Sequence, residues 1–439
     1  MLFLKMDYAV TYTGTKPGSN ETVCEGYLGS SGSTVNIMSV SGLMYDHGFS
    51  PSNPKQAWMD KLEKTVLKRP RKVTESAFYL EMRPLLFLLR LFGKISYMIN
   101  KEGKMEARLF SISSLSCLAV FAGQTFLVAR NIVTLVEVLK EEENFGRFVQ
   151  GFLILTFMAF HFFLPFSLYL ESGKICHFFN EWAVFQDLME KTTGHKFSTN
   201  YDKWLRACLF MCPLGVIIIV LYERNILYNS VWYQLIFYAI LLMIFQISLY
   251  LWIFSLIEIG YAAQVVQKEL KKTTVESCTG LNIYNYRLIW LKLSKLLEIV
   301  GDAVALTMIA MTTVNHTCFI ISAYMLISSF MHSLYDSIPF LTIMVITGLM
   351  ITQTFEPGEF VSRKLGKQIA DTLMETDISK VDSDCLKELN LFTQAVSGSN
   401  NVVTFGGFAN VNRSALAGIV GSTVTYLIVL VQFNQSPES

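Results

Sequence analysis

The sequence predicts an all-α membrane protein with seven transmembrane helices, a cytosolic N-terminus and an extracellular C-terminus. Two observations lead to this prediction: seven long apolar runs, and an unequal division of the basic residues between the two sides that those runs define. Of the 439 residues, 52% are hydrophobic and only 16% are charged. That composition is too apolar for an ordinary soluble enzyme of this length.

Seven apolar runs are long enough to cross a hydrocarbon core, which is about 30 Å thick and needs about 20 helical residues. They are Leu109–Val128, Phe148–Leu170, Leu205–Tyr222, Val231–Ile257, Ala303–Phe330, Ile338–Phe355 and Phe408–Phe433. The third run is the shortest. An odd number of spans places the two ends of the chain on opposite sides of the membrane.

The basic residues divide sharply between those two sides. Only four of the 36 Lys and Arg residues, Arg130, Lys140, Arg147 and Arg224, lie on one side, which leaves 32 on the side of the N-terminus. Basic residues are retained on the cytosolic side of a membrane, so the N-terminus is predicted inside and Ser439 outside. This orientation is the reverse of a G-protein-coupled receptor and argues against a metabotropic mechanism.

The segments outside the spans suggest three regions. Residues 1–75 form a tail without periodicity, predicted to be disordered and cytosolic. Residues 76–380 are predicted to hold six spans with cytosolic extensions, preceded by a helix over Phe78–Gly93. That helix is too short to span and is expected at the inner interface or packed on the bundle. Residues 381–439 are predicted to hold a cytosolic helix and the last span.

Two cytosolic stretches, Tyr286–Val300 and Asp382–Val396, carry apolar residues at helical spacing. Both are predicted to be amphipathic helices below the membrane, where an apolar face needs a partner. That partner is another helix of the same chain or a neighbouring subunit. We expect Leu293 and Leu389, on these faces, to contribute to subunit assembly.

Chemical motifs of enzymes are absent: the sequence has no phosphate-binding loop, no GxSxG and no HExxH. No enzyme activity, cofactor, metal or nucleic-acid partner is therefore expected. The cysteines lie in spans or cytosolic segments, so no disulfide is expected. A transporter would be expected to carry charges deep in the bundle or interrupted helices, and neither is predicted. His161 and His316 fall near mid-membrane and are weak candidates for a ligand pocket, with a structural role as the alternative.

The last span carries the most specific pattern. Its inner half contains Gly418 and Gly421, and small residues allow helices to approach closely. Its outer half, Thr425–Phe433, reads TYLIVLVQF, and resembles the TY(5 apolar)QF signature of insect gustatory receptors. Two further stretches, Tyr286–Leu296 and Gly406–Ser414, resemble the carbon-dioxide receptor subgroup of that family.

This resemblance implies a ligand-gated, non-selective cation channel of four subunits in the plasma membrane of sensory neurons. The subunits are the same chain or related receptor chains, embedded in membrane lipid, and the permeating ions are cations. Carbon dioxide is the implied ligand, in a pocket among the first six spans. The alternatives are a gustatory receptor for another small molecule, such as a sugar or bitter compound, and a metabotropic seven-helix receptor.

Three residues of the last span are expected to line the pore. Gln432, Val429, Thr425 and Ser422 lie close to one face of a helix with 3.6 residues per turn. A ring of Gln432 amides offers oxygens to a passing cation, and a ring of Val429 side chains closes by dewetting. The resemblance places the family's pore residues at these two positions. Tyr426 and Phe433 are expected to pack against neighbouring helices.

The acidic run Glu141–Glu143 lies in the first outer loop. It is either a solvated loop or, repeated in each subunit, a source of raised cation concentration near the pore mouth.

Overall fold

The structure is a computed structural model that describes residues 71–108, 112–140, 145–194, 197, 202–224, 232–276, 278–330 and 334–435. The predicted tail up to residue 70 and the acidic run Glu141–Glu143 lie outside the described residues. The α-helices are α2 (Ala77–Leu91), α3 (Ile112–Lys140), α4 (Phe145–Ala159), α5 (Leu164–Thr193), α6 (Asp202–Arg224), α7 (Trp232–Glu276), α8 (Gly280–Ala303), α9 (Ala305–Phe330), α10 (Leu334–Ser362), α11 (Gln368–Met374), α12 (Ser383–Ser397) and α13 (Arg413–Gln435). Short helical turns are η2 (Val73–Glu75), η3 (Phe160–Phe163), η4 (Arg363–Lys367) and η5 (Ile378–Lys380), and β1 (Met98–Ile99) pairs with β2 (Met105–Glu106) in an antiparallel hairpin.

The helices confirm an all-α, multi-pass membrane architecture. Among the described residues, six helical segments are long and apolar enough to cross a membrane, and they overlap all the predicted spans except the third. The third, Leu205–Tyr222, lies within α6, a continuous helix that is not one of those six. Pro213 lies inside α6, and charged residues flank its apolar stretch.

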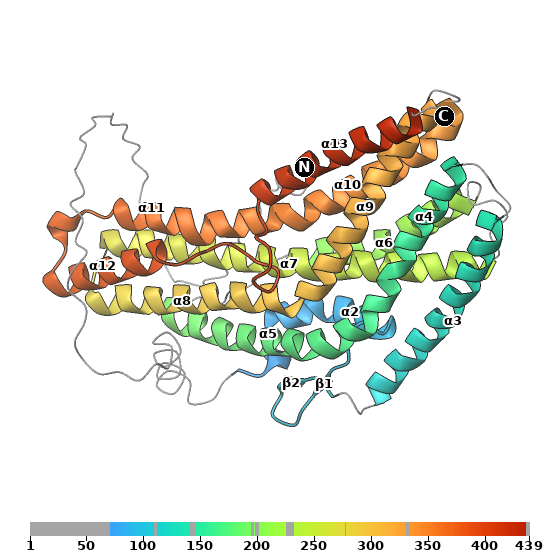
Figure 1. The fold of residues 1–439 in the computed structure, drawn as a ribbon. Helices are drawn as coiled ribbons and strands as arrows, with labels where there is room; N and C mark the ends of the chain where they lie inside the picture. The colour runs from blue at the N-terminus through green and yellow to red at the C-terminus, as the bar shows by residue number, and fades with distance from the viewer. Residues whose placement is uncertain are drawn as a thin grey trace, which may run out of the picture. The chain divides into compact units, whose positions relative to one another are not determined.

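Several helices continue far beyond the predicted spans. Helix α7 has 45 residues, about 68 Å at 1.5 Å per residue, which is more than twice the thickness of a hydrocarbon core. The stretches predicted as cytosolic loops are therefore largely helical: α5 runs on to Thr193, and α10 to Ser362. Figure 1 shows α8, α11 and α12 gathered at one end of α7, and α3 and α4 at its other end. Helices α8 and α12 confirm the two predicted amphipathic helices.

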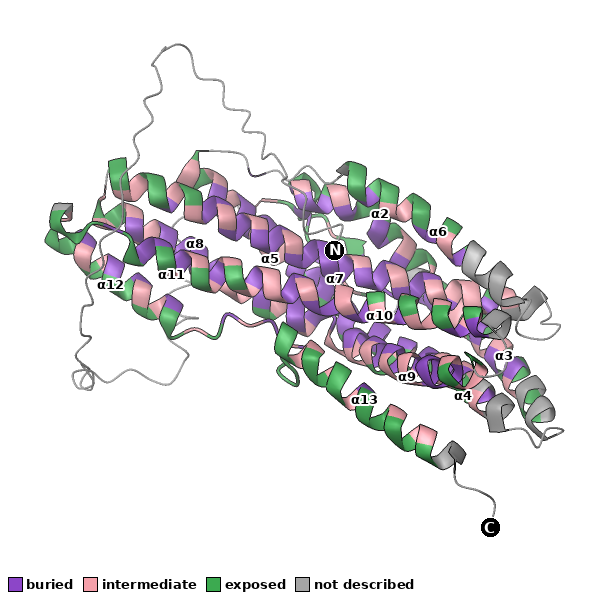
Figure 2. Cartoon of the chain, turned by 90° about the horizontal axis from the view of Figure 1, so that it is seen from above, coloured by how far each residue is buried: buried purple, intermediate pink, exposed green. Residues whose placement is uncertain are grey.

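The core lies around α7. In the most apolar stretch of α7, 72% of the residues are buried, whereas in the most apolar stretch of α13 only 6% are buried. Figure 2 shows this contrast, with α13 mostly exposed along one side of the bundle. Trp252 of α7 and Trp290 of α8 are fully buried and donate to the carbonyls of Thr354 and Leu365, at 2.9 Å each. Helix α2 packs on this bundle, the second of the two arrangements expected for it.

The second predicted span is interrupted, contrary to expectation. Helix α4 ends at Ala159, the 3-10 turn η3 follows, and α5 begins at Leu164 with Pro165 in its first turn. Proline lacks the N–H that an uninterrupted helix would need there, which accounts for the break. An interrupted helix is one of the two features that a transporter would carry, and buried charge, described below, is the other, so their supposed absence no longer argues against that class.

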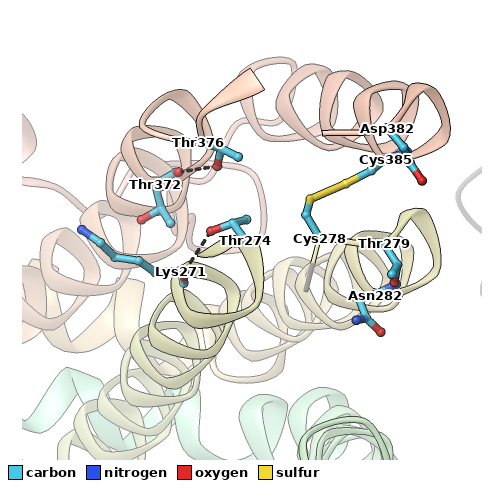
Figure 3. The surroundings of a disulfide bond; sticks show 9 residues. All are labelled: Lys271, Thr274, Cys278, Thr279, Asn282, Thr372, Thr376, Asp382 and Cys385. Atoms are coloured by element: carbon cyan, nitrogen blue, oxygen red, sulfur yellow. Dashed lines mark hydrogen bonds between the residues drawn. A yellow bond between two sulfur atoms is a disulfide. The ribbon is translucent and has the colours of Figure 1, made fainter. Parts of the chain in front are cut away.

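A disulfide joins Cys278, in the short connection between α7 and α8, to Cys385 of α12 (Figure 3). The expectation of no disulfide is therefore wrong. The two cysteines are 107 residues apart and both lie in segments predicted to be cytosolic. The expectation failed because the fold brings together the ends of two long helical hairpins, which no local spacing indicates.

Candidate pore helix

The chain reaches α13 through a tight turn over residues 403–411. Val411 N–H donates to the Val403 carbonyl at 2.8 Å, and Phe405 N–H donates to the Ala409 carbonyl at 2.9 Å. Gly406 and Gly407 close the turn with φ values of 58° and 79°, a region that favours glycine. The turn at these two glycines separates α12 from α13.

Two other glycines let this turn sit against the bundle. A Cβ on Gly301 of α8 would lie 2.4 Å from the Thr404 carbonyl oxygen, and one on Gly358 of α10 would lie 2.6 Å from the Val411 carbonyl oxygen. Such distances are far inside normal contact, so larger residues at either position would displace the turn. The entry into α13 is thus held between α8 and α10.

The first residues of α13 are fixed by polar contacts. Arg413 makes a two-point ion pair with Glu356 of α10, with N–O distances of 3.0 and 2.9 Å. The Asn412 side chain accepts from the Ala415 N–H at 2.9 Å, which caps one of the free N–H groups at the helix start. The beginning of α13 is therefore tied to α10.

Helix α13 presents two different faces. At 100° per residue, one stripe contains Leu416, Ile419, Thr423, Leu427 and Leu430, all of which are buried or half-buried against the bundle. The opposite face holds all the expected pore residues and both glycines, and they are exposed in this chain: Gly418, Gly421, Thr425, Val429 and Gln432. The residues expected to line a pore thus point away from their own bundle.

One polar contact links the buried stripe of α13 to α9. His316 Nε2 lies 3.1 Å from Thr423 Oγ1 and 3.3 Å from Ser422 Oγ. Both hydroxyls already donate to the Ile419 carbonyl, at 2.9 and 2.8 Å. Their remaining capacity is as acceptors, so the imidazole donates its Nε2–H to them. His316, a weak ligand candidate from the sequence, instead contacts the last helix.

Tyr426 and Phe433 of the TY(5 apolar)QF motif were expected to pack against neighbouring helices, and the structure describes the side chain of Tyr426 but not that of Phe433. Tyr426 is 57% exposed within its own chain, so its packing against neighbouring helices stays a prediction. The side chain of Phe433 lies outside the described residues. Ideal Cβ positions on Gly418 and Gly421 have no neighbour within 4 Å in the described part of the chain. Within the described part of the chain, these two glycines therefore have open space beside them.

Leu293 and Leu389, the expected assembly residues, are buried inside the single chain, at 0% and 5% exposure. Helix α12 packs on α8, with Trp290 and Phe392 in ring contact at 5.8 Å and Arg287 paired with Glu388 at 2.9 Å. The apolar faces of the two helices thus have the intramolecular partner that was one of the two alternatives. Their role in assembly stays a prediction.

His161 occupies a buried position in η3, between α3 and α7. Its Nε2 lies 2.9 Å from Thr125 Oγ1 of α3, and its ring stacks on Phe121 at 4.7 Å and meets Phe237 edge-on at 6.1 Å. Its Nδ1 is buried without a hydrogen-bond partner among the described residues. A buried polar atom of this kind usually has a partner, so water or a small ligand suits the position.

A buried charged cluster was not predicted. Lys94 and Glu171 are 2% exposed and form an ion pair at 2.6 Å. Lys94 also donates to Ser167 and to Thr307 Oγ1, and Glu171 accepts from the Thr307 hydroxyl and, at 2.8 Å, from its backbone N–H. The cluster joins α5 and α9 to the segment after α2. The expectation of no buried charge in the bundle is wrong, because Glu171 directly follows an apolar run and looked like a loop residue.

Comparisons with known proteins agree with this architecture. The family model for the 7tm chemosensory receptor matches residues 82–436. Gustatory and odorant receptor 24 of Anopheles gambiae is 23% identical over 394 residues, covering 89% of this chain and 84% of that protein. Gustatory and odorant receptor 21a of Drosophila melanogaster is also 23% identical over 394 residues, covering 85% of this chain and 86% of that protein.

Solved structures show the same fold. The insect olfactory receptor OR5 from Machilis hrabei, in complex with eugenol, superposes with a TM-score of 0.58 at 13% identity, covering 80% of this chain and 97% of that one. Its structure without eugenol gives 0.58 at 12% identity, covering 81% and 98%. The family match covers most of the helical bundle and the last helix together. The chain is thus a member of the 7tm chemosensory receptor family, as its resemblance to insect gustatory receptors implied.

Proposed function

We propose that this chain is one subunit of a ligand-gated, non-selective cation channel, in which α13 helices from four copies or related chains surround the pore. The observation that carries the proposal is the division of α13 into two faces. Polar side chains on this face, Thr425 and Gln432, are costly when they face lipid, whereas the same side chains facing a water-filled axis are not. One helix cannot enclose a pore, and copies related by a rotation axis can.

Within this pore we assign Gln432 to an outer ring that contacts cations and Val429 to an apolar constriction below it. A narrow apolar ring excludes water and so closes without a bulky plug. Thr425 continues the same face one turn further in. Orientation follows the charge division, with the N-terminus in the cytosol and Ser439 outside.

We further propose carbon dioxide as the ligand. The stretches Tyr286–Leu296 and Gly406–Ser414, which resemble the carbon-dioxide subgroup, lie on α8 and in the turn that enters α13. They support the subgroup without forming a ligand pocket. The relatives above are named as both gustatory and odorant receptors, and an odorant must be volatile, which favours a gas over a sugar. His161 is the ligand residue we propose. Thr125 Oγ1 already donates to the Phe121 carbonyl, so the His161 Nε2–H donates to that hydroxyl and leaves the buried Nδ1 with a lone pair that can contact a small molecule.

The decisive experiment is whole-cell recording from cells that express the chain, alone and with related receptor subunits. Solutions equilibrated with carbon dioxide at constant pH are applied while G-protein signalling is blocked. A fast cation current that persists under the block is expected. Surface-expressed receptor that gives no current in any combination, or a current abolished by the block, would overturn the channel.

The pore assignment has its own matched test. Val429 and Val420 are both exposed in the chain, at 41% and 57%, but nine residues separate them, which places them on opposite sides of α13. A charged thiol reagent should block current through Val429→Cys and leave Val420→Cys unchanged. Block of both variants, or of Val420→Cys alone, would place the pore on another face.

A further inference from the structure

The sulfur atoms of Cys278 and Cys385 are brought together by two helix starts that face each other (Figure 3). Cys278 precedes Thr279, whose hydroxyl accepts from the Asn282 N–H at 3.3 Å and begins α8. The Asp382 side chain begins α12 and accepts from the Cys385 N–H at 2.6 Å. Each cysteine thus lies at the capped start of its own helix.

The backbone contact between these helix starts is close. A Cβ on Gly280 would lie 3.2 Å from the Asp384 carbonyl carbon and 3.4 Å from the Cys385 nitrogen. The Cα atoms of Cys278 and Cys385 are 6.5 Å apart, within the range that a disulfide spans. The two thiols therefore remain within bonding reach when they are reduced.

The two cysteines differ in access to solvent. Cys385 is fully buried, at 0% exposure, whereas Cys278 is partly exposed. Redox-sensing sites commonly pair an accessible cysteine with a resolving one beside it. The pair lies beyond the end of α7, on the side where the N-terminus is expected, and cytosolic thiols are kept reduced except where a disulfide is transient.

We propose that Cys278 and Cys385 form a reversible redox switch that reacts with peroxides. The accessible Cys278 thiol takes one oxygen from the peroxide and becomes a sulfenic acid, releasing one water or alcohol. The Cys385 thiol then attacks the sulfenic sulfur, forms the disulfide and releases a second water. Two electrons pass from the two thiols to the peroxide. Two molecules of a cellular thiol such as glutathione reduce the bond and become a glutathione disulfide.

The disulfide restrains the segment that leads to α13. It anchors the first turn of α12 to the start of α8, and α12 continues through the turn at residues 403–411 into α13. Without the bond, α12 is held on α8 by side-chain contacts such as the Arg287–Glu388 pair. Oxidation therefore favours the arrangement described here and lowers the response to ligand. This effect on current rests on the proposed channel function, whereas the thiol chemistry does not.

The chemical test uses the full chain in intact cells. Two samples are compared, one untreated and one treated with a hydrogen peroxide pulse. In each sample the remaining free thiols are blocked with one maleimide and the disulfides are then reduced. The thiols released by reduction receive an isotope-labelled maleimide for mass spectrometry. The peptides of Cys278 and Cys385 should gain the second label together and lose it after dithiothreitol. Cys278→Ser should leave Cys385 without the second label. Labels that stay constant through peroxide and dithiothreitol, or that change at one cysteine only, would overturn the switch.

The functional test compares ligand-evoked current before peroxide, after peroxide and after reductant. Wild type should lose current with peroxide and regain it with dithiothreitol, while the double variant Cys278→Ser, Cys385→Ser responds to ligand and ignores both reagents. A reversible label with unchanged current would remove the proposed restraint on gating. Wild type with a reversible label and no ligand-evoked current under any condition would instead contradict the channel function.

Discussion

The contact between His316 and Thr423 offers a quantitative test of how the bundle acts on α13. We predict that Thr423→Val, which replaces the hydroxyl by a methyl group of similar volume, raises the current that flows without ligand. His316 joins α9 to the buried stripe of α13, so its hydrogen bond stabilises the arrangement in which α13 rests on its own bundle. If opening moves α13 away from α9, the bond contributes only to the closed state.

The magnitude follows from interhelical hydrogen bonds in membranes, which contribute about 0.6 kcal/mol on average and at most about 1.7. Since about 1.4 kcal/mol is tenfold in an equilibrium constant, the ratio of open to closed channels should rise about threefold and at most roughly 16-fold. His316→Phe, which keeps a planar ring without the N–H, should have a similar effect. Both changes remove the bond between His316 and Thr423, and His316→Phe also removes the longer contact to Ser422 Oγ, so the double variant should equal the His316→Phe effect.

The assay is ligand-free current per receptor at the cell surface, from single-channel records or normalised whole-cell current. Thr313→Val is the matched control. Thr313 lies on α9, as His316 does, its side chain is exposed, and among the described residues its hydroxyl donates only to the Ile309 carbonyl of the same helix. Independent effects of His316→Phe and Thr423→Val that simply add, or ligand-free current that is unchanged or lower in both, would refute the coupling. An equal rise with Thr313→Val would show a general loss of α9 integrity.

The remaining predictions concern orientation, the pore and the outer loop. A tag after Ser439 should be stained on intact cells and one before Met1 only after permeabilisation; the reverse pattern contradicts the charge argument. Gln432→Glu should shift relative cation permeability, and Val429→Ser should raise ligand-free current; two surface-expressed variants with wild-type values would remove these residues from the pore. Replacing Glu141–Glu143 by Gln should lower single-channel conductance more at low than at high ionic strength, since salt screens exposed charges. If the ratio of variant to wild-type conductance is the same at both ionic strengths, the acidic run is only a solvated loop.

Much of the fold could be predicted because membrane spans depend on local composition. The length of the apolar runs in the sequence predicted all the described spans, and the helical spacing of Ile289, Leu293 and Leu296 predicted α8. The continuation of α5 beyond its span was missed because its charged residues resemble those of a loop. In the structure its other face is apolar and fully buried, with Phe179 and Trp182 at helical spacing. A search for helical period alone, without the membrane criterion, would have found it.

The candidate site was predictable only in part, for a different reason. Helical geometry, at 100° per residue, predicts that Thr425, Val429 and Gln432 share one face of α13. This prediction does not depend on knowing which helices pack against α13. Which residue meets the opposite face does not follow, since His316 lies 107 positions before Thr423. The same holds for Cys278 and Cys385. Long-range pairing depends on how helices assemble, and one sequence holds no local signal for it.

Two polar attachments of helix α9 within the described part of the chain differ greatly in strength. At its start, Thr307 joins the Lys94–Glu171 pair, where both charges are buried and removing one partner of such a pair costs about 3–5 kcal/mol. Nine residues later, about 13.5 Å along the helix, His316 makes a neutral, half-buried contact with α13. A motion that separates helices breaks the weaker link first. We therefore expect the start of α9 to stay attached to α5 during gating, and the contact between His316 and α13 to be the one that opens and closes.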